Sequence, residues 1–293
     1  MAQEKPLYVR GMQGLGDNLY QRAFISQLRG PVWLQTPWPE LYEDLSGVHF
    51  VRARTTLRTQ VKNVDRQAAA RWEHPPAGAR EIAVSYGRAS PFDREPFIST
   101  AESMRRLFKV EPAWSLPPAP AACVGARPYA LVRPVTVREE WRAEARNPRP
   151  EYIAEAVQEL RRRGCFVISV ADLEPGKEWL VAPDPGADQK LHHGELDVMQ
   201  LLSLVSDAAV CVGGVGWLTP AALMARVPLY TVLGGLGGFN SRECLTDPTM
   251  DLSQTGWAIP ENFCRCFSRQ HGCRKEIPDF ISKFRRWLDE RGM

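Results

Sequence analysis

Residues 206–235 have the sequence SDAAVCVGGVGWLTPAALMARVPLYTVLGG, which joins an apolar run, a glycine-rich loop, a short helix and a second apolar run. The first run, 208–212, predicts a buried strand, and the second, 229–233, predicts another. Two further apolar runs, 129–132 and 166–170, alternate with helical segments. This alternation is the pattern of an α/β protein with a parallel sheet.

The loop between these strands has the features of an anion site. It contains three glycines that let a ligand approach the backbone N–H groups, namely Gly213, Gly214 and Gly216. We expect Thr219 to be the N-cap, and Pro220 the first residue, of a helix extending to 225. The positive end of this helix would favour a phosphate group. A tight crossover without a ligand would contain the same glycines, so the loop alone leaves both interpretations open.

A second glycine-rich loop follows the amino-terminal strand expected at 7–10. Residues 11–18, GMQGLGDN, lead directly into an amphipathic segment at 19–28. The third glycine of the dinucleotide fingerprint is missing, and no Asp or Glu stands at the end of the next strand. Both absences disfavour an NAD enzyme. Asp17 lies where the helix begins, so its carboxylate could cap the helix or act as a general base.

With both loops in view, the chain resembles the heptosyltransferase-like glycosyltransferases of family nine. The opening G-x-[LM]-G-D-x-L turn of that family is matched by Gly14, Leu15, Gly16, Asp17 and Leu19. The second domain of the family carries an apolar strand, an Asp-Ser/Thr-Gly-x-x-His motif, a small-residue helix and Val-Pro, and residues 212–228 correspond to this region. Here the motif is replaced by Gly-Val-Gly-Trp-Leu-Thr, so that only Gly216 survives and Thr219 occupies the place of the histidine.

The resemblance implies a GT-B fold, in which two Rossmann-like parallel-sheet domains face a central cleft. We expect an acceptor-binding domain at 1–115, a nucleotide-sugar-binding domain at 116–276, and a C-terminal helix at 277–293 that packs back toward the first domain. The boundary lies in the proline-rich segment 112–120, which has the composition of a semi-rigid connector. A chain of 293 residues with 44% hydrophobic residues can bury the cores of two such domains.

The activity implied by the resemblance is inverting, metal-independent transfer of a sugar from a nucleotide-diphosphate sugar to an acceptor hydroxyl. Asp17 would be the base, and no cofactor is expected besides the donor itself. An arginine within 138–146 would take the part of the family's donor-binding lysine. The donor-binding residues expected on this basis are Arg133, Arg138, Arg142, Arg146, Glu178, Gly213, Gly214, Gly216, Trp217 and Thr219.

The expected first domain carries an excess of positive charge. Residues 51–110 contain twelve Lys or Arg against six Asp or Glu, although the formal net charge of the whole chain is only +3. This stretch could bind an anionic acceptor, or it could be an ordinary solvated face. The acceptor-binding residues that we expect are Gly14, Gly16, Asn18, Arg54 and Arg58.

The sequence leaves three functions open. The family usually glycosylates the lipopolysaccharide core, which favours an anionic saccharide as acceptor. The basic first domain and the altered donor motif leave room for a phage-type enzyme that glycosylates a modified DNA base. The lost acid and histidine also leave room for an inactive protein that binds a nucleotide sugar.

The remaining sequence features concern compartment and metal binding. The amino terminus lacks an apolar core of the length that a signal peptide needs, and the glycines and proline within 208–225 argue against a membrane span. We therefore expect a cytoplasmic monomer, in the host cytoplasm if the gene is phage-encoded. Seven cysteines, an odd number, speak against a full disulfide framework. A zinc site could be formed by Cys264, Cys266, His271 and Cys273, but the tight Cys-x-Cys spacing favours a reduced cysteine cluster.

Overall fold

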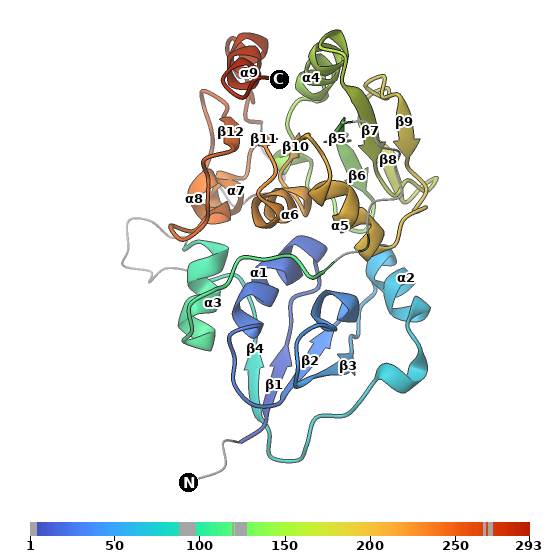
Figure 1. Cartoon of the computed structure of the whole chain (residues 1–293), viewed down its shortest axis with the longest axis vertical. Coiled ribbons are helices and arrows are strands. Elements are labelled where there is room, and N and C mark those ends of the chain that lie inside the picture. Colours follow the sequence, from blue (N-terminus) through green and yellow to red (C-terminus); the bar gives the residue numbers. More distant parts are fainter. Residues whose placement is uncertain (1–4, 88–97, 119, 121–127, 266–267, 269–271) are drawn as a thin grey trace. The chain divides into compact units, whose positions relative to one another are not determined.

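The computed structural model describes residues 5–87, 98–118, 120, 128–265, 268 and 272–293, and it divides into two units, Met1–Pro118 and Ala119–Met293 (Figure 1). The division falls inside residues 112–120, where the sequence predicts a boundary. The main sheet of each unit is parallel throughout, which confirms the expected α/β fold with parallel sheets. Within the described residues, no helix is both long enough and apolar enough to cross a membrane.

The first unit contains four parallel strands in the order β3-β2-β1-β4. The strands are β1 (Leu7–Arg10), β2 (Val32–Thr36), β3 (Val48–Arg52) and β4 (Arg80–Ala83). The helices are α1 (Leu15–Ile25), α2 (Arg58–Arg66) and α3 (Thr100–Phe108), with short 3₁₀ turns η1 (Pro39–Tyr42) and η2 (Ala69–Arg71). The α1 helix completely buries Leu19, Ala23 and Phe24, which lie on one face at helical spacing. Phe108 of α3 stacks on Phe24, so α3 packs beside α1.

The second unit contains six parallel strands in the order β12-β11-β10-β5-β7-β9. These are β5 (Tyr129–Arg133), β7 (Phe166–Val170), β9 (Gln189–Leu191), β10 (Val210–Gly214), β11 (Leu229–Val232) and β12 (Thr255–Ala258). A separate antiparallel pair is formed by β6 (Thr136–Arg138) and β8 (Glu178–Leu180). The helices are α4 (Pro150–Arg162), α5 (Val198–Ser206), α6 (Leu218–Ala225), α7 (Gly237–Asn240), α8 (Arg242–Leu245) and α9 (Phe280–Asp289), with a 3₁₀ turn η3 (Glu144–Arg146).

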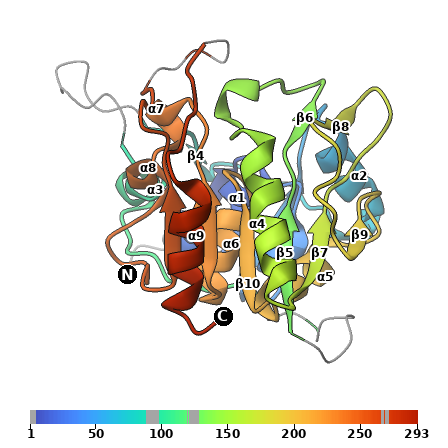
Figure 2. The same cartoon turned by 90° about the horizontal axis from the view of Figure 1, so that it is seen from above.

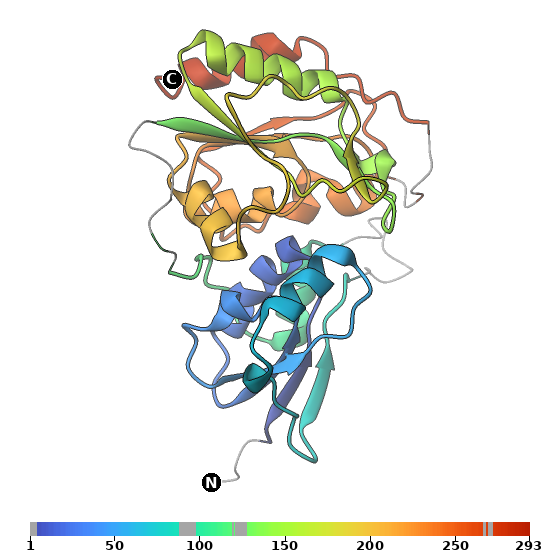
Figure 3. The same cartoon turned by 90° about the vertical axis from the view of Figure 1, so that its right-hand side faces the viewer.

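Helices cover both faces of this six-stranded sheet. Figure 3 shows α4 and α9 on one face and α5 and α6 on the other. The β10 strand pairs with β5 and β11, so it is enclosed on every side. Its residues Val210, Cys211 and Val212 are fully buried, as expected for a central parallel strand.

The C-terminal helix α9 is part of the core of the second unit. Phe280, Phe284, Trp287 and Leu288 are buried there. The ring of Tyr230 on β11 contacts all three aromatic side chains of this set. The helix lies beside α4, as Figure 2 shows from above. Its packing toward the first domain stays a prediction.

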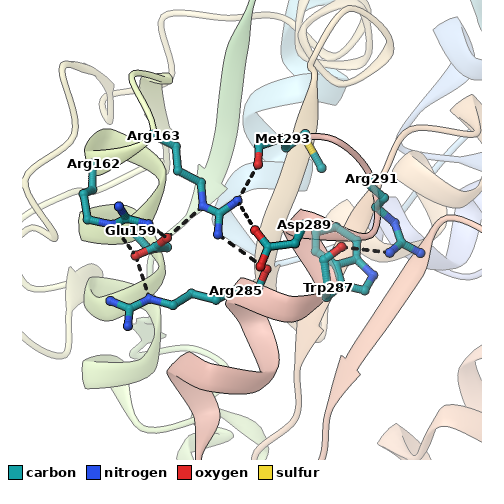
Figure 4. Close-up of polar contacts among 8 residues, drawn as sticks. All are labelled: Glu159, Arg162, Arg163, Arg285, Trp287, Asp289, Arg291 and Met293. Atoms are coloured by element: carbon teal, nitrogen blue, oxygen red, sulfur yellow. Dashed lines mark hydrogen bonds and ion pairs between the residues drawn. The ribbon is translucent and has the colours of Figure 1, made fainter.

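An ionic cluster joins α9 to α4 (Figure 4). We call it the Glu159 clasp, and it comprises Glu159, Arg162, Arg163 and Arg285. The Glu159 carboxylate is 1% exposed and accepts bonds from the three guanidinium groups at 2.5, 2.7 and 2.9 Å. Arg163 also pairs with Asp289 of α9 at 2.8 Å. The hydrogen bond from Arg162 is the main reason that the pKa of Glu159 lies well below its usual range.

The Glu159 clasp yields a prediction about stability. Glu159→Gln should lower the free energy of unfolding at pH 7 by about 2 kcal/mol, because three arginines lose the buried carboxylate that they share. The lowered pKa means that the stabilisation is complete above about pH 4.3, the ordinary glutamate pKa, and is lost as the pH falls further. Urea unfolding of wild type and variant should therefore differ at pH 7 and converge in acid. The exposed Glu151→Gln on the same helix is the control, and an equal loss there would contradict the assignment.

Candidate functional site

The strand order of the second unit identifies where a ligand would bind. From β5 the chain continues to β7 and β9 on one side and then returns to β10 on the other side of β5. The order therefore reverses between β5 and β10. Open parallel sheets bind ligands at the carboxyl ends of the strands that flank such a reversal.

The glycine loop follows β10 at this point. Gly213 and Gly214 are the last residues of the strand, which ends two residues later than the sequence predicts. The expectation that Thr219 is the N-cap is wrong, because α6 begins at Leu218 and Trp217 is its N-cap. The backbone of Trp217 is already helical, and the Thr219 N–H donates to the Gly216 carbonyl at 3.2 Å. The helical turn therefore starts two residues before Thr219, which is buried in the first turn.

Two arginines lie beside this loop with a buried carboxylate. Arg133 is the last residue of β5, and its guanidinium group lies against Gly216. A side chain at position 216 would clash with this guanidinium group. Arg138 on β6 pairs with Glu178 of β8 at 2.7 Å, from Nε to Oε2. The Glu178 side chain is 2% exposed and also accepts the Thr136 hydroxyl at 3.0 Å. The antiparallel pair β6–β8 thus holds the Glu178 carboxylate and the Arg138 guanidinium group next to each other.

The electrostatics of these groups favour an anion. The pKa of Arg133 is lowered to about 10, mainly by burial and also by the positive charges of Arg138 and Arg146, while Glu178 opposes the shift. Arg133 therefore stays charged at neutral pH beside two like charges and one opposite charge. We call Arg133, Arg138 and Arg146 the arginine cluster. An anion bound among them would relieve the repulsion and accept charge-assisted hydrogen bonds.

The two residues that follow Arg146 hold it in place. Pro148 packs on Gly214, and a side chain at Gly214 would come within 2.9 Å of it. The Asn147 amide donates to the Thr136 carbonyl at 2.8 Å. The Lys275 ammonium donates to the Asn147 carbonyl at 2.9 Å, so the segment is tied on two sides. These contacts join residues far apart in the chain, and no local signal predicts them.

Arg142 differs from the other arginines of the expected donor set. Its side chain is 55% exposed and pairs with Glu139 at 3.0 Å. Its guanidinium carbon lies 5.6 Å from the centre of the Trp179 ring, a cation–π distance. Binding of a donor by Arg142 stays a prediction.

The strand order of the first unit also reverses, between β1 and β4, and we call such a reversal a switch point. The loop after β1 leads into α1, whose N-cap is Gly14 with no side-chain cap bond. Asp17 is the third helical residue, so its carboxylate does not act as the N-cap, although it favours the first turn of the helix. Tyr86, three residues beyond β4, donates its hydroxyl to Asp17 Oδ1 at 2.6 Å. Tyr86 is not among the residues expected from the sequence, which also did not predict the short β4 strand.

A buried polar network holds this loop in shape. Asn18 is 0% exposed, and its amide donates to the carbonyl groups of Met12 and Gly14 at 2.7 and 2.9 Å. Its Oδ1 accepts the hydroxyl groups of Thr36 at 2.7 Å and Tyr42 at 3.0 Å. Asn18 thus positions the loop that carries Asp17. Its contact with an acceptor, and that of Gly14 and Gly16, stays a prediction.

The basic stretch contains an open pocket of about 590 Å³. It follows the carboxyl end of β3, and its walls include Arg52, Arg54, Thr55 and Asp65. Arg52 pairs with Asp65 at 2.9 Å, so its charge is matched, while Arg54 is exposed. Arg58 begins α2, two residues after Thr56 of the same pocket wall, and is half-buried.

The predicted cysteine cluster is only partly covered by the structure. Cys264 and Cys273 are half-buried. Cys266 and His271 lie outside the described residues. Among the residues that are described, no group of three or more His, Cys, Asp or Glu side chains could hold a metal ion.

Comparison with known proteins gives matches among solved structures. No protein-family model matches the sequence, and no curated protein does. ADP-heptose LPS heptosyltransferase II from E. coli matches with a TM-score of 0.59 and 12% identity, over 99% of this chain and 100% of that chain. The glycosyl transferase family 9 protein from Veillonella parvula DSM 2008 has a TM-score of 0.57 and 10% identity, over 100% and 97%.

A third match is TibC from enterotoxigenic E. coli H10407, an iron-containing dodecameric glycosyltransferase. Its TM-score is 0.58 at 16% identity, and the match covers 94% of this chain and 66% of TibC. This chain therefore spans about two thirds of the TibC chain. The chain has the fold of the heptosyltransferases and family 9 glycosyltransferases. At these identities the likeness establishes the fold alone, and it confirms the expected α/β fold with parallel sheets, while two domains that face a central cleft stay a prediction.

The contact between Gly216 and Arg133 can be tested by substitution. Gly216→Val should push the Arg133 guanidinium out of the arginine cluster and weaken pyrophosphate binding by about tenfold or more. The thermal midpoint should change little, because the displaced group is the end of a flexible side chain. Calorimetric titration with pyrophosphate measures the effect. The control is Gly272→Val, where a side chain meets open space. Unchanged affinity in Gly216→Val would remove the anion site from this loop.

Proposed function

We propose that the protein is an inverting, metal-independent glycosyltransferase that moves a sugar from a nucleotide-diphosphate sugar to a hydroxyl of an anionic, lipopolysaccharide-type saccharide. The observation that carries the proposal is the arginine cluster beside the glycine loop, at the switch point of the second unit. The shared fold supports it, because the similar E. coli protein is an ADP-heptose heptosyltransferase. A TibC structure contains ADP-D-beta-D-heptose.

The donor diphosphate would bind in the second unit. Arg133 and Arg146 supply positive charge, and Arg138 supplies more although it shares Glu178. Gly216 lets the backbone approach the phosphate groups closely, and the amino-terminal end of α6 adds a favourable dipole. Guanidinium groups suit this role because each presents several N–H donors to phosphate oxygens. Trp217, half-buried at the N-cap, would border the same site.

The chemical step would join the two sites. Asp17 accepts the proton of the acceptor hydroxyl as that oxygen attacks the anomeric carbon of the sugar. The bond from the anomeric carbon to the diphosphate breaks at the same time, which inverts the configuration. The nucleoside diphosphate leaves with the bonding electrons, and the arginine cluster stabilises the charge that develops on it.

The acceptor would bind in the first unit through its negative charge. Arg54 lines the pocket after β3, with the hydroxyl groups of Thr55 and Thr56 in the same wall. This combination of two hydroxyl groups and an arginine outside the Arg52–Asp65 pair suits a phosphorylated saccharide. Arg58 would add a second positive charge at the start of α2.

The proposal is tested with a panel of nucleotide-diphosphate sugars and a phosphorylated core saccharide. We expect transfer from one donor to the saccharide, with release of the nucleoside diphosphate. Donor binding without hydrolysis or transfer would contradict an enzyme and leave an inactive binding protein. Binding to duplex DNA that weakens steeply with salt, together with transfer to DNA, would contradict the saccharide acceptor.

Asp17 is the residue on which the proposed chemistry depends. Asp17→Asn keeps a side-chain oxygen that can accept from Tyr86 but removes the basicity of the carboxylate. Transfer should fall by about a hundredfold or more, while donor affinity and melting temperature stay unchanged. The matched control is Glu81→Gln, which changes an exposed carboxylate on β4 of the same unit. This variant should transfer the sugar at the wild-type rate. Near-normal transfer by a stable Asp17→Asn protein would remove the base from the mechanism.

The role of the basic pocket is tested by charge reversal. Arg54→Glu combined with Arg58→Glu should raise the Michaelis constant for the acceptor by about tenfold or more, with little change for the donor. Added salt should weaken the wild-type acceptor interaction in the same direction. The control is Arg80→Glu, which reverses the charge of an exposed arginine on β4. If acceptor kinetics respond to neither the double reversal nor salt, the stretch is a solvated face.

A further inference from the structure

The hydroxyl of Tyr86 meets the carboxylate of Asp17 because two neighbouring strands end together. Strands β1 and β4 are parallel and paired, with Arg10 opposite Ala83. Asp17 follows the end of β1, and Tyr86 follows the end of β4. The phenol oxygen lies 2.6 Å from Asp17 Oδ1, a length typical of a hydrogen bond from a hydroxyl group to a charged oxygen.

The other carboxylate oxygen lies near Gly14. Oδ2 lies against the backbone of Gly14, where a side chain would come within 2.5 Å of it. The Asp17 carboxylate thus has the Tyr86 hydroxyl bound at Oδ1 and the Gly14 backbone near Oδ2. Gly14 itself is fixed, because its carbonyl accepts the backbone N–H and the side-chain amide of Asn18.

The backbone around Tyr86 is anchored although its side chain is 46% exposed. The Ser103 hydroxyl on α3 donates to the Ser85 carbonyl at 2.9 Å. The backbone of Gly87 lies against Ile98 and Ser103, where any side chain would strike both. The Val84 N–H donates to the Arg10 carbonyl at 2.9 Å, which continues the pairing of β4 with β1. The segment that carries Tyr86 is thus fixed before and after this residue.

We propose that Tyr86 is a positioning residue for Asp17, which orients the carboxylate and stabilises its ionised form. The inference rests on the proposed function, in which Asp17 is the base. A phenol is a far weaker acid than a carboxyl group, so the shared proton stays on the Tyr86 oxygen. The acceptor hydroxyl then meets a carboxylate that is already ionised and oriented. Orientation of this kind reduces the reorganisation needed at the moment of transfer.

The experiment compares the wild type with Tyr86→Phe. Loss of the hydroxyl removes a hydrogen bond to the charged form, so the pKa of Asp17 should rise and the acid limb of kcat/KM should move up by about one pH unit. At neutral pH, kcat should fall on the order of tenfold, with donor affinity unchanged. Burial is the main reason that the pKa values of the neighbouring Tyr20 and Tyr42 are raised, and the charge of Asp17 raises them too, so both phenols stay neutral in acid.

A readout that needs no activity separates this inference from the proposed function. Carbon-13 NMR titration of the Asp17 carboxyl group, assigned with Asp17→Asn, should show the same upward shift in Tyr86→Phe. Tyr8→Phe, a second tyrosine change in the same unit, should leave the titration unmoved. If Asp17→Asn is inactive but Asp17 titrates identically with and without the Tyr86 hydroxyl, the positioning role is overturned and the proposed base stands. If Asp17→Asn remains active, the proposed base falls, and the inference falls with it.

Discussion

The close backbone contact between residues 146–148 and the ends of β10 and β11 is the constraint on which the site of the second unit depends. Pro148 lies against Gly214, and the carbonyl groups of Arg146 and Asn147 lie against Gly234. A side chain at either glycine would push this segment away from the sheet. Arg146 would move with it and leave the neighbourhood of Arg133. The glycines therefore determine the charge of the site as well as its shape.

The first unit holds its loop by a different means. Asn18, Thr36 and Tyr42 form a buried network in which both the amide nitrogen and the amide oxygen of Asn18 have partners. Gln21 extends the network, since its amide accepts the Met12 N–H and donates to the Tyr42 hydroxyl. A buried polar network is stabilising only when its members are satisfied, so a change at one position would disturb the whole loop. Asp17 lies on a rigid support for this reason.

The altered loop motif and the arginine cluster are connected. The acid and the histidine of the family motif are absent here, and the surviving Gly216 lies under the guanidinium group of Arg133. Small residues at this loop make room for a charge that comes from the neighbouring strand β5. Within the proposed function, the charges that meet the diphosphate come from arginines outside the loop. This places the donor-binding groups on the rigid sheet and on the tied segment before α4.

The sequence by itself determined the parallel α/β character, the apolar strand before the glycine loop, and the loop that carries Asp17, because hydrophobic runs and glycine or proline signals act over a few residues. The start of α6 differs from the expectation, because Trp217 already has a helical conformation and is the N-cap in place of Thr219. Only the tertiary structure decided the contacts of Asp17 with Tyr86, 69 positions away, and of Lys275 with Asn147, 128 positions away. Such contacts depend on strand order and on which strand ends coincide. A local pattern of residues does not encode either of these.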